Sequence, residues 1–111
     1  MNIVVEKQPA QSKLDSLGVS KWPTWKKEVS TFPWTFLEQE VAYILEGECV
    51  ITPEGGAPVN FGKGDLVTFP AGLKTVWEVK LPLHKHYKLD GNIVSQTWRR
   101  IKAAFKINMP F

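Results

Sequence analysis

The sequence predicts an all-β domain, built as an antiparallel sandwich or a small barrel. Short runs of β-branched and aromatic residues recur along the chain and are closed by glycine or proline, which is typical of strands joined by tight turns. From residue 40 to residue 89 no helical pattern separates these runs, so the strands are expected to pair in antiparallel fashion. A length of 111 residues allows one such domain and leaves no room for a second.

The N-terminal part is expected to hold an edge strand, a helical turn and a longer strand. Residues 3–5 are apolar and form the edge strand, and residues 13–18 form a single helical turn that the glycine at its end stops. Residues 24–30 follow as a strand, with Trp25 and Val29 on its apolar side.

Two extended segments come next. Residues 32–37 are aromatic, and Pro33 places them at a sheet edge or a strand start because proline cannot donate a ladder hydrogen bond. Residues 40–45 are largely apolar at both odd and even positions, which predicts a strand covered on both faces. Gly47 is expected to form a turn or bulge that resets the alternation, so the face on which Cys49 lies stays open.

The remaining strands are short. Residues 53–56 contain proline and two glycines and predict a hairpin turn. The strands expected after it cover residues 59–61, 66–69, 73–79 and 83–89.

Beyond Gly91 the apolar residues recur with a helical period. Asn92 is a plausible N-cap, and the sequence predicts a helix over residues 92–106. Its apolar stripe consists of Ile93, Val94, Thr97, Trp98, Ile101, Ala104 and Phe105. We therefore expect residues 1–89 to form the β domain and residues 90–111 a C-terminal helical extension.

Composition and charge limit the function classes. The net charge is +3, and the positive excess gathers in residues 80–106, where Arg99, Arg100, Lys102 and Lys106 lie off the apolar stripe. A basic helix without interleaved aromatic residues on a recognisable binding fold does not favour nucleic acid as a partner. No segment is apolar for long enough to be a signal peptide or a membrane span. With a single cysteine, Cys49, expected to be a small buried apolar residue, the chain fits a reducing cytoplasm.

Two spaced motifs resemble those of the cupins. The first cupin motif ends with a glutamate, six residues and a glycine, and Glu40 and Gly47 stand at this spacing. The second runs from a glycine through proline and glycine to a histidine; Gly64, Pro70 and Gly72 match it, and Thr75 stands at the histidine position. The resemblance implies an RmlC-like cupin barrel, that is, a double-stranded β-helix or jelly roll, here followed by the C-terminal α-helix.

Within the cupins the sequence is similar to the small single-domain group related to the cupin domain of ureidoglycine aminohydrolase. The segments that carry this likeness are Trp22-Pro23, Leu45-Glu46-Gly47, residues 64–72 and Lys85-His86-Tyr87. Because several spaced segments agree in order over residues 2–89, the likeness is specific.

The metal ligands of the cupins are largely missing. Depending on the motif spacing, the two histidines of the first motif fall on Trp34 and Phe36, or on Pro33 and Thr35. The relatives often carry a cysteine where this chain has Ala42. Only Glu40 remains of four ligands, and a transition metal needs three or four converging donors. The sequence therefore predicts no metal and no cofactor.

Glu40 is the candidate catalytic residue. In the cupin register it points into the barrel, where a carboxylate among aromatic rings suits a general acid or base. The alternative is a structural carboxylate that pairs with a lysine or a backbone amide. The residues expected to line a pocket around it are Trp34, Phe36, Ala42, Thr75 and Trp77.

His84 and His86 offer an alternative metal site. Residues two apart on a strand share a face, so the two imidazoles could chelate a metal together with Glu40. The other interpretation is that one histidine is hydrogen-bonded at the edge of the core and the other is solvated, or that both are solvated.

Two functions of different class follow. The first is a small cupin whose interior pocket binds a small polar organic molecule, with or without catalysis; as an enzyme it would be metal-independent, and family analogy points to amide or ureide hydrolysis. The second is a non-catalytic cupin, a homodimeric binding or scaffold module whose apolar surface and C-terminal helix meet a partner. An open cavity at Glu40 favours the first, and an interior filled by Trp34 and Trp77 favours the second.

Overall fold

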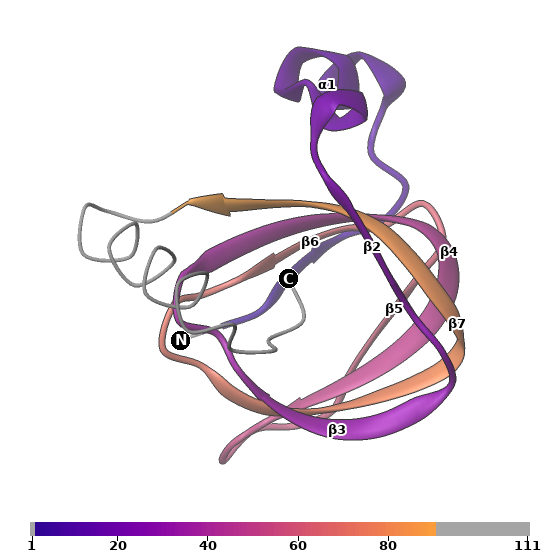
Figure 1. Cartoon of the computed structure of the whole chain (residues 1–111). Coiled ribbons are helices and arrows are strands. Elements are labelled where there is room, and N and C mark those ends of the chain that lie inside the picture. Colours follow the sequence, from indigo (N-terminus) through magenta and orange to yellow (C-terminus); the bar gives the residue numbers. More distant parts are fainter. Residues whose placement is uncertain (1, 91–111) are drawn as a thin grey trace, which may run out of the picture.

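The computed structural model describes residues 2–90, which form an antiparallel β barrel with a short helix beside it (Figure 1). In chain order the elements are β1 (Val4–Glu6), α1 (Gln11–Leu17), the 3-10 turn η1 (Val19–Lys21), β2 (Thr24–Lys27), β3 (Ser30–Thr35), β4 (Gln39–Pro53), β5 (Val59–Gly62), β6 (Leu66–Phe69) and β7 (Lys74–Asp90). The prediction of an antiparallel, mostly β domain is confirmed for these residues.

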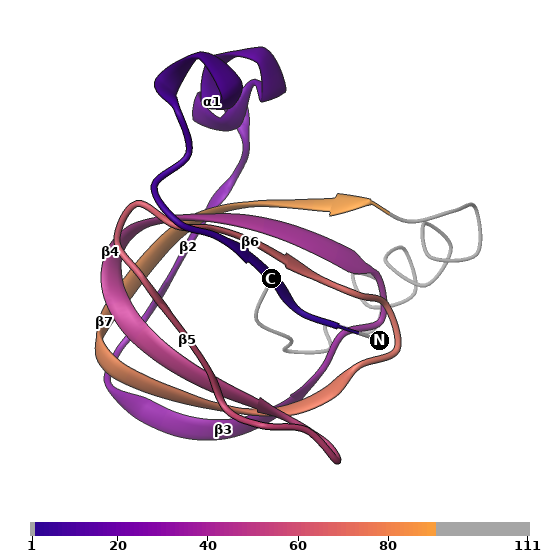
Figure 2. The ribbon, with the colours of Figure 1, turned by 180° about the vertical axis from the view of Figure 1, so that it is seen from behind.

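Strands β4 and β7 are the frame of the barrel. They pair with each other from the Gln39–Asp90 pair to the Pro53–Thr75 pair, and every other strand except β1 pairs with one of them. The sheet order is β1-β6-β4-β7-β2, with β3 added to β7 and β5 added to β4. Figure 2 shows the two long strands curving around the interior from behind.

Strand β4 changes face at a bulge around Gly47. Glu40, Ala42 and Ile44 are buried before it, and Cys49 and Ile51 after it, so the buried positions switch from even to odd numbers. The register with β7 shifts within the same segment. Gly47 has a φ of 112°, and a β carbon there would lie 2.6 Å from the carbonyl oxygen of Pro82. The predicted reset at Gly47 is confirmed, and it turns Cys49 inward.

Strand β7 corrects one prediction. Residues 73–79 and 83–89 were expected to be separate strands, yet β7 runs unbroken over 17 residues. The ladder to β4 pairs Glu48 with Leu81 and then Glu46 with His84. Pro82 thus lies opposite the bulge, where its missing N–H leaves no ladder hydrogen bond unmade.

The prediction for the segment between β2 and β3 was also wrong. Val29 was expected on the buried side of one strand over residues 24–30, but β2 ends at Lys27 and Val29 is 58% exposed. The hydroxyl of Ser30 donates to the carbonyl oxygen of Glu28 and closes the turn at this point. Trp25, by contrast, packs against the core as expected.

Helix α1 covers the outside of the sheet rather than its interior. Leu14, Val19 and Leu66 form a second apolar cluster, against which Val41 and Tyr43 of β4 pack. The helix ends at Gly18, whose φ of 71° is left-handed. The predicted turn and its glycine stop are confirmed, and Figure 1 shows the helix standing at one end of the barrel.

Aromatic rings fill much of the interior. The Phe36 and Phe69 rings stack at 4.6 Å between centroids, and Trp77 lies 5.5 Å from Phe69 and 5.6 Å from Phe61. All four side chains are at most 3% exposed. The core is therefore closely packed around Trp77.

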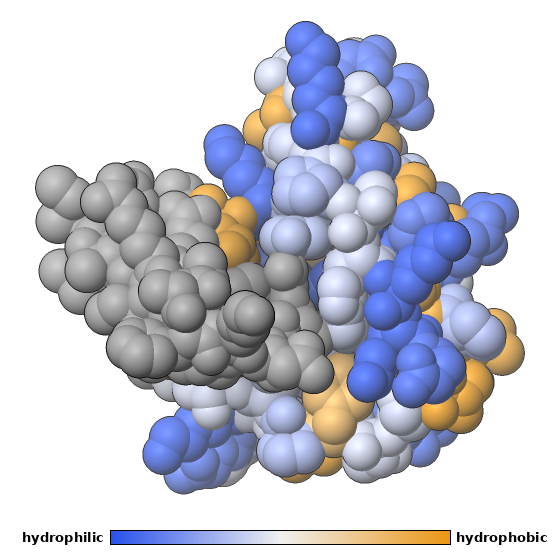
Figure 3. Space-filling model, in the orientation of Figure 1, coloured by the Kyte–Doolittle hydropathy of each residue, from blue (hydrophilic) through white to orange (hydrophobic). Residues whose placement is uncertain are grey.

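The outside of the described residues mixes polar and apolar side chains. On the face in Figure 3, blue and orange residues are interspersed outside the grey atoms. The large exposed hydrophobic residues are Val4, Leu17, Val29, Val76 and Leu81. Among the described residues no helix is long and apolar enough to cross a membrane. The helix predicted for residues 92–106 lies outside the part described and stays a prediction. The extension was expected to begin at residue 90, but Asp90 is the last residue of β7.

Candidate functional site

A buried ion pair lies inside the barrel. The Nζ of Lys85 on β7 is 2.5 Å from Oε2 of Glu40 on β4, and the two side chains are 2% and 1% exposed. Glu40 pairs with Leu89 across the ladder and Lys85 with Ile44, so both project inward from neighbouring strands. The candidate carboxylate is thus inside the barrel, bound to an ammonium that is equally shielded from water.

Two indole rings enclose the ammonium of Lys85. Its Nζ lies 5.2 Å from the ring centroid of Trp25 and 5.2 Å from that of Trp77. Cation–π contacts of this kind contribute about 1–2 kcal/mol each when water is excluded. The carboxylate and both rings therefore stabilise one positive charge at one point in the barrel.

Two buried polar atoms of this cluster have no hydrogen-bond partner among the described residues. They are Oε1 of Glu40, an acceptor, and Nε1 of Trp77, a donor. Buried polar groups in folded proteins are almost always hydrogen-bonded, and an unmade bond costs about 1–3 kcal/mol. A group that carries both a donor and an acceptor would satisfy the two atoms.

Tyr87 and Cys49 are the titratable neighbours of the pair. Burial raises the pKa of Tyr87 and the negative charge of Glu40 raises it further. Burial also raises the pKa of Cys49 to about 12, although Lys85 opposes the shift. Both groups therefore stay protonated near neutral pH, and the thiol is not a nucleophile there.

The structure places the other predicted pocket residues in the core. Trp34, Phe36, Ala42 and Trp77 are at most 9% exposed and belong to one packed cluster. The Thr75 hydroxyl donates to the carbonyl oxygen of Trp34 at 2.7 Å, so at the cupin histidine position it links β7 to β3.

These residues do not fit a divalent metal. The Glu40 carboxylate is bound to a cation, and the Thr75 hydroxyl is used by the backbone. Within residues 2–90 no three histidine, cysteine or acidic side chains come together. The donor set therefore offers no coordination sphere at the cupin ligand positions.

His84 and His86 lie on the opposite face of β7 from Lys85, so the structure does not bring them to Glu40. Nδ1 of His86 is 2.8 Å from the carbonyl oxygen of Trp22 and must donate to it, because a carbonyl only accepts. His84 lines an outer cavity beside Lys26 and Glu46.

Sequence reasoning missed Lys85 as a site residue. The signal was present in the alternation of β7, where residues 75, 77, 79 and 83 are buried and 85 continues the series. A lysine at such a position is rarely buried without a partner, and Glu40 was the carboxylate already expected inside. Trp25 was also left out, because no register linked β2 to β7.

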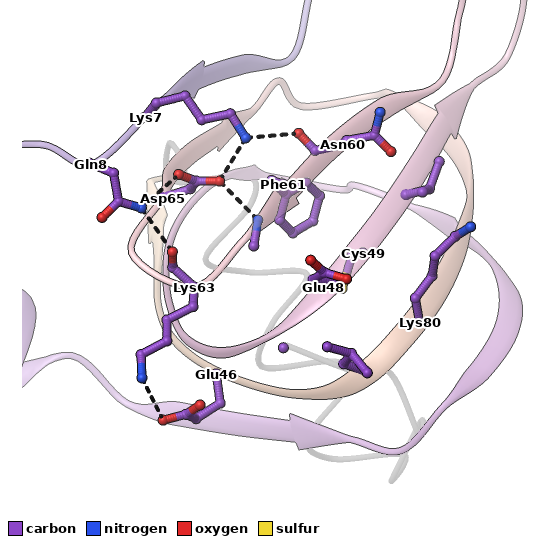
Figure 4. A pocket seen from close by; sticks show the side chains of 14 residues that line it. Lys7, Gln8, Glu46, Glu48, Cys49, Asn60, Phe61, Lys63, Asp65 and Lys80 are labelled. Carbon is purple, nitrogen blue, oxygen red and sulfur yellow. Dashed lines mark hydrogen bonds and ion pairs between the residues drawn. The ribbon is translucent and has the colours of Figure 1, made fainter.

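A groove of about 640 Å³ lies outside the barrel, near the bulge of β4 (Figure 4). Its charged groups largely satisfy one another. Asp65 accepts from Lys7 at 2.9 Å and from the backbone N–H of Gly62 at 2.9 Å, and Lys63 lies 3.5 Å from Glu46. These contacts hold the N-terminal segment against the turn before β6, so the groove has a structural role. The buried pair of Glu40 and Lys85 is therefore the candidate site.

Glu40, Phe36 and Trp77 do not line the groove near the bulge of β4, nor three other cavities whose linings lie within residues 2–90. Glu40 and Lys85 lie among packed aromatic side chains, and their own side chains are 1% and 2% exposed.

Comparison with protein families gives one match. The EutQ-like cupin domain family matches residues 14–87. A search of curated proteins found no significant match.

Solved structures give further likenesses. A DUF861 family protein from Thermotoga maritima is 47% identical, with a TM-score of 0.78 over 80% of this chain and 100% of that one. A Salmonella typhimurium protein described as ethanolamine utilization protein Q is 25% identical, with a TM-score of 0.53 over 58% of this chain and 51% of that one. The EutQ protein of Clostridium difficile, at 22% identity, has a TM-score of 0.54 over 77% and 64% and shares the fold.

Proposed function

The chain belongs to the EutQ-like cupin domain family, and we propose that it binds a small, neutral, polar organic molecule inside the barrel, against Glu40, Lys85 and Trp77. The buried pair of Glu40 and Lys85, with an unsatisfied oxygen beside it, is the observation that carries the proposal.

A buried ion pair is a poor device for stability alone. Removing two charges from water costs several kcal/mol per ion, and well-packed apolar residues often replace such a pair without loss. A pair kept in the core of a small barrel, with one carboxylate oxygen left unbonded, is better explained by a ligand. Strongly desolvated charges of this kind cluster at functional sites.

The charges of the pair define the ligand class. The negative charge of Glu40 and the positive charge of Lys85 neutralise each other, so an ionic ligand would bring an uncompensated charge into the core. Trp77 offers a donor and Glu40 an acceptor. A molecule with a carbonyl or hydroxyl oxygen next to an N–H or O–H matches both, and primary amides, ureides and small hydroxy compounds have this pattern. The likeness to the ureidoglycine aminohydrolase cupin domain supports including ureides.

Catalysis at this site would be proton transfer. Glu40 lies within hydrogen-bond distance of Lys85 and has a second oxygen for the ligand, so it can take a proton from one partner and return it to the other. The Tyr87 hydroxyl stays protonated and supplies a donor.

The test is calorimetric titration of the protein with acetamide, urea, allantoin and glycolaldehyde. The matched variant is Glu40→Gln/Lys85→Met, which removes both charges together and keeps the side-chain volumes close. We expect saturable binding of at least one compound by the wild-type protein and loss of that binding in the double variant. Equal binding by both proteins, or binding of none of the four by the wild type, contradicts the proposal.

A homodimeric scaffold is the second candidate. Trp34 and Trp77 both lie in the packed core, which is the filled interior that favours this candidate. Exposed apolar side chains such as Val76 and Leu81 are available to a second chain. Sedimentation of the wild-type protein and of Val76→Lys distinguishes the two. A dimer that this substitution disrupts, together with no ligand response, favours the scaffold.

A further inference from the structure

We propose that Lys85 forms an imine with a small aldehyde or ketone, with Glu40 as the proton carrier. The inference rests on the proposed function, because it names a reaction for a molecule bound at that site. It starts from a property of Lys85 that ligand binding alone does not require: a lysine amine enclosed in the core and in contact with a carboxylate.

The position of the amine favours nucleophilic chemistry. Lysine side chains that catalyse through imines are desolvated and lie beside a group that accepts their proton. Lys85 meets both conditions, with 2% side-chain exposure and a carboxylate oxygen at 2.5 Å. When the Lys85 ammonium passes one proton to Glu40 during the reaction, a neutral amine and a neutral acid result, so the step leaves no isolated charge in the core.

The reaction balances without a further reagent. Glu40 takes one proton from the Lys85 ammonium, and the Nζ lone pair attacks the carbonyl carbon, so that a C–N bond forms and the C=O π electrons move to oxygen. Glu40 gives its proton to that oxygen and takes a second proton from Nζ, which yields the carbinolamine. Glu40 then protonates the hydroxyl, which leaves as water while the C=N bond forms. The products are one water, a protonated imine and the Glu40 carboxylate.

The surroundings of Lys85 match the product as well as the reactant. The protonated imine carries one positive charge at the place where the ammonium carried one. The Glu40 carboxylate and the ring faces of Trp25 and Trp77, each 5.2 Å from Nζ, therefore stabilise the charge throughout the reaction. The nearby thiol does not compete, because burial keeps Cys49 protonated.

Trp25 is the route of access. It lies on β2, which pairs with β7 alone among the described strands, and its side chain is half-buried. In this proposal, a rotation of the Trp25 indole admits the carbonyl compound from the side of the sheet edge. The adjacent Trp77 ring is 2% exposed and fixed among other rings.

The experiment is reductive trapping. The full-length protein is incubated with glycolaldehyde or hydroxyacetone and sodium cyanoborohydride, and adducts are located by peptide mass spectrometry. Lys85→Arg keeps a cation beside Glu40 but cannot form the imine, and Lys80→Arg, at an exposed lysine of the same strand, is the matched control. We expect an adduct concentrated at Lys85, lost in Lys85→Arg, unchanged in Lys80→Arg and formed faster in Trp25→Ala.

Ethylene glycol and 1,2-propanediol, which lack the carbonyl group, separate this inference from the proposed function. If these diols and the carbonyl compounds bind in a Glu40-dependent way but no adduct forms at Lys85, imine formation is wrong and the binding site stands. If nothing binds and labelling is spread evenly over the exposed lysines, both are wrong.

Discussion

A lysine and a glutamate hold the least exposed charges in the described part of the barrel, and the first prediction concerns them. Glu40→Gln leaves the Lys85 ammonium buried without a counter-charge, so the free energy of unfolding should fall by about 3 kcal/mol or more. Urea unfolding at neutral pH measures this.

The double variant Glu40→Gln/Lys85→Met removes the uncompensated charge. It should recover most of the stability lost in the single variant, because apolar replacement of a buried pair is often neutral. A single variant as stable as the wild type would mean that water reaches the pair.

Asp65 gives a prediction that depends on pH. Burial raises its pKa, but hydrogen bonds from Lys7 and the N–H of Gly62 outweigh burial and leave the pKa below the ordinary value. A lowered folded-state pKa means that the stabilisation is present above the unfolded pKa of about 3.9 and is lost as the pH falls towards the folded value.

Asp65→Asn should therefore lose about 2 kcal/mol at pH 7, in line with charge-assisted hydrogen bonds, and should show a flatter dependence on pH below 4. Melting curves from pH 7 to pH 2.5 check this. Glu54→Gln, at an exposed carboxyl group in the β4–β5 turn, is the control and should follow the wild type. Parallel curves for Asp65→Asn and the wild type at acid pH would contradict the stated role of Asp65.

Single residues also show what the sequence could reveal about the candidate site. The resemblance to the cupin motifs placed Glu40 and Thr75 inside, and strand alternation added Trp77. Lys85 was missed because a lysine is normally expected on the surface. Only its alternation with the apolar residues of the same strand indicates that it points inward. Trp25 needed the pairing of β2 with β7, which no local pattern encodes.

At the scale of strands, the bulge of β4 is set by Gly47. An added β carbon would lie 2.6 Å from the carbonyl oxygen of Pro82, and the φ of 112° disfavours any side chain. Gly47→Ala should therefore lower the free energy of unfolding by roughly 3 kcal/mol, combining backbone strain with overpacking.

Gly55→Ala is the matched control, since Gly55 also has a positive φ but has open space around it. Its cost should be only about 1–2 kcal/mol, from the left-handed backbone alone. Equal losses in the two variants, by urea unfolding, would show that the close approach to β7 is unimportant.

The sequence could show where strands occur, but not where two predicted strands join into one. Apolar alternation and glycine or proline stops located part of each strand in residues 2–90, but not the second half of β4 after Gly47 or the middle of β7. Residues 73–79 and 83–89 were expected as two strands, because local propensity does not reveal that β4 bulges opposite Pro82. The exposure of Val29 was missed for a similar reason: one apolar residue in a turn looks like the continuation of a strand.

At the scale of the whole molecule, the prediction concerns the C-terminal residues 91–111, which lie outside the described part. The sequence predicts a helix there whose apolar stripe includes Trp98, Ile101 and Phe105. Leaving such side chains in water costs about 25 cal/mol per Å² of apolar area. A chain that ends at Leu89 should melt at a lower temperature or change its oligomeric state.

Differential scanning calorimetry and sedimentation velocity on the full and shortened chains measure both effects. Identical melting and sedimentation would mean that the stripe packs on neither the barrel nor a second chain.

The most direct test of the central claim follows the Trp77 indole by nuclear magnetic resonance. The Nε1–H of Trp77 is buried and lacks a hydrogen-bond partner among the described residues, so its ¹⁵N–¹H signal reports a new acceptor. The signal can be assigned from the one lost in Trp77→Phe. During titration with the compound that binds in calorimetry, the account predicts a saturable downfield shift of this signal in the wild type and none in Glu40→Gln/Lys85→Met. A compound that saturates the protein while the Trp77 signal stays in place would contradict it.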